Sequence, residues 1–196
     1  EMCIRDSIVA TIRALKYHGG MKLSELGNEN LDALSKGFEN LDKHIENMHY
    51  YGFRPVVAVN RFSSDTDAEI ELLRKYCEEH NVKVAVNTAW ADGGKGAVEL
   101  AEAVIEAADS CIDCFTPLYD MSWSIEKKIE TIASLMYGAR NVEYTLEAKD
   151  QMKKIGELGL DNLAVCIAKT QKSLSDDQSL RNRPRDFTVR IRRVEL

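Results

Sequence analysis

The sequence predicts an α/β fold, in which helices cover a parallel sheet, followed by a smaller α+β part. Three short runs rich in β-branched residues, at 8–12, 55–59 and 82–86, are typical of buried strands, and a helical pattern follows each of them. Strands that alternate with helices in this way form parallel sheets through right-handed crossover connections. The run at 55–59 is apolar without alternation, which indicates a strand covered on both faces.

The longest predicted helix lies between the first two strands. Its apolar residues recur at alternating steps of three and four, which places them on one face of a helix. These residues are Leu31, Leu34, Phe38, Leu41, Ile45 and Met48. Asn28 or Asn30 can cap its start, and Gly37 within it indicates close packing against a neighbouring element. Thr66 and Glu69 have the spacing of a capping box, which predicts the start of the next helix.

The pattern changes in the second half of the chain, so we expect a parallel α/β part over 8–115 and an α+β part over 116–196. The elements predicted in the second part are helices at 124–137 and 145–158, a buried strand at 163–168, and an alternating strand at 187–194. In the last of these, Phe187, Val189 and Ile191 are expected to face inward.

Composition and charge exclude several classes of protein. The net charge of −6 argues against a nucleic-acid-binding protein, and no apolar run is long enough to predict a membrane-spanning helix. The five cysteines are irregularly spaced, which favours a reducing compartment, and we expect the protein to be cytoplasmic. Cys111 and Cys114 lack the further ligands that a zinc site needs, so we predict no metal site. Residues 1–7, EMCIRDS, are expected to be a leader that is foreign to the fold.

Ligands of open parallel sheets bind at the carboxyl ends of the strands. The sequence predicts three such ends, at 13–20, 60–64 and 87–96. Phe62 and Trp90 follow the second and third strands and could form a slot for a flat heteroaromatic ring. The alternative is that both aromatic residues only pack in the core.

The end of the first strand carries Arg13, Lys16 and His18, which are candidates for binding an anion such as phosphate. The alternative is an exposed polar loop. Gly19 and Gly20 allow positive φ and indicate a close approach of the backbone to another group. The glycine-rich stretch at 93–96 lacks the GxxxxGK[ST] pattern of a phosphate-binding loop, so it does not predict a nucleotide site.

Residues 9–20, VATIRALKYHGG, resemble a signature segment of the formate–tetrahydrofolate ligases, and 8–194 resemble the later-middle part of that family. The resemblance implies an incomplete P-loop NTPase-like architecture. It also implies that Phe62 and Trp90 sandwich the pterin ring of tetrahydrofolate and that Val86 lines the same pocket. Lys169 lies in an AKTQ segment that is similar to one in the family, and we expect it to line the cleft.

The resemblance further implies an enzyme of one-carbon metabolism, which joins formate to tetrahydrofolate with ATP and Mg²⁺ and passes through formyl phosphate. The family also uses a monovalent cation and is usually a homotetramer. The GxxxxGK[ST] loop of the family occurs nowhere in the 196 residues. We therefore expect this chain to be an internal fragment that is inactive alone. The alternative is a stand-alone folate-binding or interaction module without catalysis.

Overall fold

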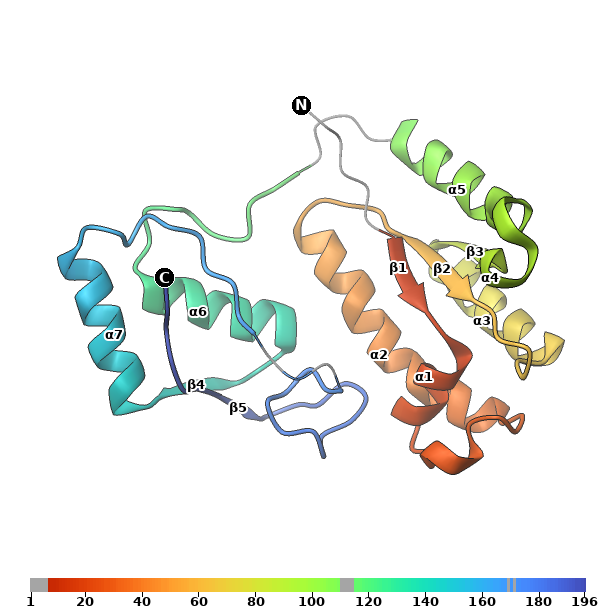
Figure 1. Cartoon of the computed structure of the whole chain (residues 1–196), viewed down its shortest axis with the longest axis horizontal. Coiled ribbons are helices and arrows are strands. Elements are labelled where there is room, and N and C mark those ends of the chain that lie inside the picture. Colours follow the sequence, from red (N-terminus) through yellow and green to blue (C-terminus); the bar gives the residue numbers. More distant parts are fainter. Residues whose placement is uncertain (1–6, 110–114, 169, 171) are drawn as a thin grey trace. The chain divides into compact units, whose positions relative to one another are not determined.

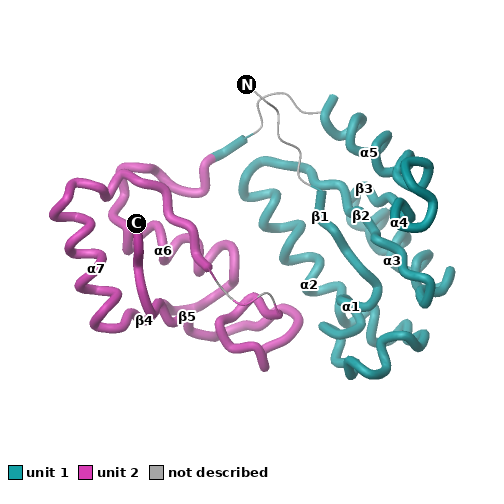
Figure 2. The backbone as a smooth tube through the Cα atoms, in the orientation of Figure 1, with its two compact units in different colours: residues 1–116 teal, residues 117–196 magenta. Residues whose placement is uncertain are grey.

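The structure is a computed structural model that describes residues 7–109, 115–168, 170 and 172–196. The chain divides into two compact units, residues 1–116 and residues 117–196 (Figure 2). Each unit has its own buried core. None of the helices in the described ranges is both long and apolar enough to cross a membrane.

A parallel sheet organises the first unit (Figure 1). Its strands are β1 (Ser7–Ala10), β2 (Val56–Asn60) and β3 (Lys83–Asn87), and they lie side by side in that order. The four apolar residues of β2 are buried, which confirms the strand predicted from its continuous apolar run. β1 begins at Ser7, a residue that the sequence had assigned to the foreign leader.

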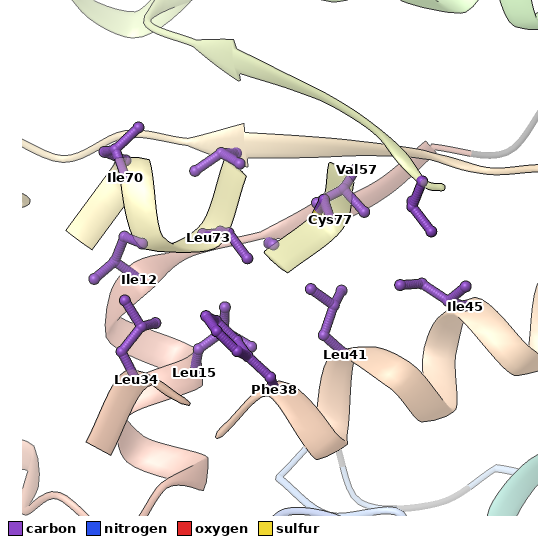
Figure 3. Close-up of a cluster of buried hydrophobic side chains, with 13 residues drawn as sticks. Ile12, Leu15, Leu34, Phe38, Leu41, Ile45, Val57, Ile70, Leu73 and Cys77 are labelled. Atoms are coloured by element: carbon purple, nitrogen blue, oxygen red, sulfur yellow. The ribbon is translucent and has the colours of Figure 1, made fainter. Parts of the chain in front are cut away.

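Helices and short helical turns connect the strands of this sheet and follow the last of them. Their bounds are α1 (Ile12–His18), the 3₁₀ turn η1 (Leu23–Glu25), α2 (Leu31–Tyr50), α3 (Asp67–Glu79), α4 (Ala89–Asp92), the 3₁₀ turn η2 (Gly93–Ala97) and α5 (Val98–Asp109). The predicted stripe of α2 is largely buried and packs with α1 and α3 against the sheet (Figure 3). Asn30 caps α2, and the predicted capping box of α3 is present. The α/β class and the parallel sheet are therefore confirmed.

The sequence predicts that the first strand runs into a loop. In the structure it leads into helix α1 instead. Thr11 caps this helix by accepting a hydrogen bond from the Ala14 amide at 3.1 Å. Of the two glycines at the end of α1, Gly19 allows the close approach of helix α2, whereas Gly20 has φ of +101° and open space around it. A Cβ atom at Gly19 would lie 1.7 Å from the carbonyl oxygen of Ala33, and one at Gly37 would lie 2.0 Å from that of Leu15. The close approach is therefore between two helices, as predicted for Gly37.

The second unit contains α6 (Ile125–Ile132), the π-helical turn η3 (Ala133–Tyr137), β4 (Asn141–Tyr144), α7 (Leu146–Glu157) and β5 (Thr188–Ile191). Both predicted helices are present, and the first ends in the π-helical turn. β4, which the sequence did not predict, pairs in parallel with β5. Phe187, Val189 and Ile191 are buried, which confirms their predicted inward orientation.

The strand predicted at 163–168 is wrong, because the described residues of this segment form no strand and are mostly exposed. Side chains from elsewhere satisfy its backbone instead. The buried Lys128 ammonium donates to the carbonyls of Asp161 and Leu163, the second at 3.0 Å. The Tyr119 hydroxyl accepts a hydrogen bond from the Val165 amide at 2.9 Å. An apolar segment whose backbone bonds to side chains need not pair with another strand.

Candidate functional site

Phe62 and Trp90 lie just beyond the carboxyl ends of β2 and β3, which are neighbours in the sheet. Phe62 is 42% exposed and Trp90 is 70% exposed. Large aromatic side chains usually bury most of their surface in a core. Their exposure contradicts the alternative that these two residues only pack in the core, and it leaves apolar ring surface at a strand end where parallel sheets bind ligands.

Trp90 is anchored although its ring is exposed. Its indole Nε1–H donates to the carbonyl of Arg61 at 2.8 Å, which ties α4 to the residue beside Phe62. Below it, the Asn87 side-chain amide donates to the side-chain oxygen of Asn60 at 2.8 Å. These two bonds join the ends of β2 and β3 through side chains, so the two aromatic residues belong to one connected surface.

The glycine-rich stretch at 93–96 supports the backbone around Trp90. The Thr88 amide donates to the Gly96 carbonyl at 3.0 Å, and a Cβ atom at Gly96 would lie 2.6 Å from the carbonyl carbon of Thr88. Gly93 has φ of +60°, in the region that favours glycine. Gly93 and Gly96 are therefore required by a tight turn that folds back on the end of β3.

Phe62 is held at its backbone by Asp65. Its amide donates to Asp65 Oδ2 at 2.8 Å, and its carbonyl accepts a hydrogen bond from the Asp65 amide at 3.0 Å. The Asp65 side chain is buried, and its Oδ1 accepts no hydrogen bond from the described residues. Burial raises the pKa of Asp65, and Glu69 adds to this, whereas the Phe62 amide, Lys16 and Arg13 act in the opposite direction.

Arg13 joins the same surface from the first strand end. It is exposed on the first turn of α1, and its Cζ lies over the Phe62 ring at 5.5 Å from the centroid. This is within the range of a cation–π interaction. The structure therefore brings together Arg13 and Phe62, two residues that the sequence placed at separate strand ends.

Lys16 is not exposed to a ligand in this structure. It is fully buried, and its Nζ forms an ion pair with Glu69 Oε1 at 2.7 Å and donates to the Asn28 carbonyl at 2.8 Å. Glu69 also accepts hydrogen bonds from the amides of Asn30 and Thr66. Burial raises the pKa of Glu69, but Lys16 and these amides outweigh it, so the pKa lies below its ordinary value. The anion role expected of Lys16 thus becomes a structural role that links α1, α2 and α3.

The remaining predicted site residues are dispersed. His18 is half-buried in the last turn of α1, where its ring meets the edge of Tyr17. Val86 is half-buried in β3 and packs against the core of the first unit. Lys169 lies outside the described residues.

Two residues at the site were missed in the sequence. The capping box identified Glu69 only as a helix start, and nothing local indicates that Lys16, far away in the chain, is its partner. Asp65 had a weak signal, because an aspartate three residues after Phe62 can bond back to the backbone of a turn. Local patterns therefore identified the two aromatic residues but not the tasks of the Asp65 and Glu69 carboxylates.

The sequence was also compared with models of known protein families. A family model described as formate–tetrahydrofolate ligase matches residues 5–196, nearly the whole chain. The match confirms the resemblance seen in the signature segment, and it begins within the residues that were expected to be a foreign leader. With exposed aromatic residues at adjacent strand ends and a family match of this extent, the chain belongs to the formate–tetrahydrofolate ligase family.

Proposed function

We propose that Phe62 and Trp90 form a slot for the pterin ring of tetrahydrofolate, within an enzyme that joins formate to that substrate. The observation that carries the proposal is the exposure of both aromatic rings at adjacent strand ends. Flat heteroaromatic rings stack on such side chains, and each aromatic contact contributes about 0.5–1.5 kcal/mol beyond its buried area. Val86 is proposed to line the aliphatic side of the slot.

Charge near the slot suits an anionic part of a ligand. Arg13 is exposed and lies over Phe62, so we propose it as the principal cation for a phosphate or carboxylate group. His18 is proposed as an additional group that lines the cleft. Lys16 is left out, because its ammonium is already paired with Glu69.

The described residues do not identify a site for the ATP-dependent half of the reaction. The sequence contains no GxxxxGK[ST] loop, and the described residues include no group of three or more His, Cys, Asp or Glu that could hold a metal ion. We derive no step through ATP with Mg²⁺. The family reaction that we assign consumes ATP, proceeds through formyl phosphate, uses a monovalent cation and takes place in a cytoplasmic homotetramer.

Titration of the chain with tetrahydrofolate by isothermal calorimetry tests the slot. Trp90→Ala and Phe62→Ala are each expected to weaken binding by about tenfold, because each removes one stacking face. The free energy of unfolding should change by less than about 1 kcal/mol in Trp90→Ala, since the ring is largely exposed. Trp123→Ala, in the second unit, is the matched control and should bind as the unchanged chain does. Equal affinity in Trp90→Ala and the unchanged chain would refute the slot.

A second function shares this site. Two exposed aromatic residues at adjacent strand ends, in a sequence without a GxxxxGK[ST] loop, favour folate binding without catalysis by these 196 residues. We therefore propose that the chain alone forms no 10-formyltetrahydrofolate from ATP, formate and tetrahydrofolate. A measurable rate of product formation by the purified chain would overturn this proposal while leaving the slot itself intact.

A further inference from the structure

The loop that carries Phe62 is built around a buried carboxyl group. Asp65 is only 5% exposed, although it lies between an exposed strand end and the first turn of α3. Burying a carboxylate is unfavourable unless it is paired or hydrogen-bonded. One oxygen of Asp65 has no hydrogen-bond donor among the described residues. The burial of this carboxyl group is therefore only partly compensated by hydrogen bonds.

The other oxygen of Asp65 has a defined task. It accepts a hydrogen bond from the Phe62 amide at 2.8 Å, while the Asp65 amide donates a hydrogen bond to the Phe62 carbonyl at 3.0 Å. The backbone of Phe62 is thus held on both sides by one residue. This determines the direction in which the aromatic side chain leaves the chain, and only its side-chain torsions stay adjustable.

Two further contacts restrict the same ring and loop. Arg13 lies over the ring of Phe62, and Arg61 forms an ion pair with Asp67 at 2.6 Å on the other side of the loop. The Lys16–Glu69 pair lies beneath, where Glu69 Oε2 accepts the Thr66 amide at 3.2 Å. These contacts restrict the loop at several points, and Asp65 is the group that is hydrogen-bonded to the backbone of Phe62.

We propose that Asp65 is a positioning residue for the pterin slot, which acts by holding the backbone of Phe62 in the orientation that a stacked ring requires. This inference rests on the proposed function, because it assigns a task to Asp65 in the same site. The task needs a hydrogen-bond acceptor and not a negative charge. Asparagine, which keeps an acceptor oxygen at the same place, should therefore replace Asp65, whereas alanine should not.

The test compares Asp65→Ala with Asp65→Asn in the full chain, with tetrahydrofolate as the probe in isothermal calorimetry. Loss of a hydrogen bond of this kind should weaken binding by about tenfold in Asp65→Ala. Asp65→Asn should stay within about threefold of the unchanged chain, since the acceptor remains. Glu71→Gln, which removes one exposed carboxylate from α3, is the charge control and should have no effect.

A double-mutant cycle separates positioning from a general structural effect. If Asp65 acts through Phe62, Asp65→Ala should weaken binding no further once Phe62 is already alanine. Additive losses, or equal losses in Asp65→Asn and Asp65→Ala, would overturn the inference.

A measurement without ligand keeps the two proposals distinguishable. Hydrogen exchange at the Phe62 amide, followed by NMR, should accelerate at least tenfold in Asp65→Ala relative to Asp65→Asn, while exchange in β2 stays unchanged. If the chain binds no tetrahydrofolate but shows this pattern, the proposed function fails and the hold on Phe62 is supported. If Phe62→Ala weakens binding but neither Asp65 variant changes binding or exchange, the slot stands and the inference about Asp65 fails.

Discussion

Replacing Lys16 with methionine should destabilise the first unit far more than an ordinary charge deletion. The Lys16 ammonium and the Glu69 carboxylate are 2.7 Å apart, and both side chains are fully buried. Methionine has a similar length but no charge, so it leaves the Glu69 carboxylate buried without its cation. It also leaves the Asn28 carbonyl without its donor.

The expected loss of stability depends on the burial of the two side chains more than on the distance between their charged atoms. Breaking a buried pair by removing one partner typically costs about 3–5 kcal/mol, because an uncompensated charge remains. Lys36 and Asp32 form an equally short pair of 2.6 Å, but their side chains are 63% and 78% exposed. An exposed pair at this helical spacing contributes about 0.5 kcal/mol or less. Lys36→Met is therefore the matched control.

Urea unfolding of the full chain, followed by far-UV circular dichroism, measures both variants. With a denaturant dependence of about 2 kcal/mol per molar, a loss of 4 kcal/mol moves the midpoint down by roughly 2 M. Hydrogen exchange of α1 and α2 assigns the loss to the first unit. If Lys16→Met does not fold, Glu69→Gln provides a milder test, because glutamine carries no charge and keeps one acceptor oxygen, for the Asn30 or the Thr66 amide.

The double variant Lys16→Met with Glu69→Leu makes the reasoning refutable. Apolar replacement of a whole buried pair is often close to neutral, but Glu69→Leu also removes the acceptor of the Asn30 and Thr66 amides, so the double variant should recover part of the stability that Lys16→Met loses. A shift in Lys16→Met as small as that in Lys36→Met would refute the assignment of a buried charge pair.

Two further predictions follow from the packing and the charges of the first unit. Gly37→Ala should lower the free energy of unfolding by about 1–2 kcal/mol despite the better helix propensity of alanine, because its Cβ would lie 2.0 Å from the Leu15 carbonyl oxygen. Gly27→Ala, with open space around it, is the control in the same urea titration, and equal effects of both variants would contradict the close helix contact. Asp65→Asn should gain stability relative to the unchanged chain as the pH rises from about 4 to 7, because a raised carboxyl pKa means that the folded state loses stability as that group ionises. A stability difference that is independent of pH, measured by urea unfolding at each pH, would show that burial does not raise the pKa of Asp65.

Local patterns in the sequence determined the parts of the fold that depend on near neighbours. The stripe of α2, the capping box at Thr66 and the buried run of β2 depend on residues within a few positions of one another, and all of them are present. The placement of Phe62 and Trp90 also follows from local patterns, because residues that follow a parallel strand within a few positions lie near its carboxyl end.

The wrong predictions of secondary structure concern segments that contact residues far away in the chain. The segment 163–168 has the composition of a strand, but it is held by Lys128 and Tyr119 and not by another strand. The sequence predicts a loop after Thr11, because a β-branched run ends there and two glycines follow. In the structure these residues form helix α1, and Gly19 at its end lies against the backbone of α2.

The sequence by itself determined the family, the parallel α/β order and the place of Phe62 and Trp90 at two strand ends, whereas their exposure came from the structure. Only the tertiary structure decided what the charged residues around them do. Lys16 is buried against Glu69, Arg13 lies over the Phe62 ring, and Asp65 holds the Phe62 backbone. The physical reason is that the free energy of a charge depends on its burial and its partners, and both are set by helices that come together from distant parts of the chain.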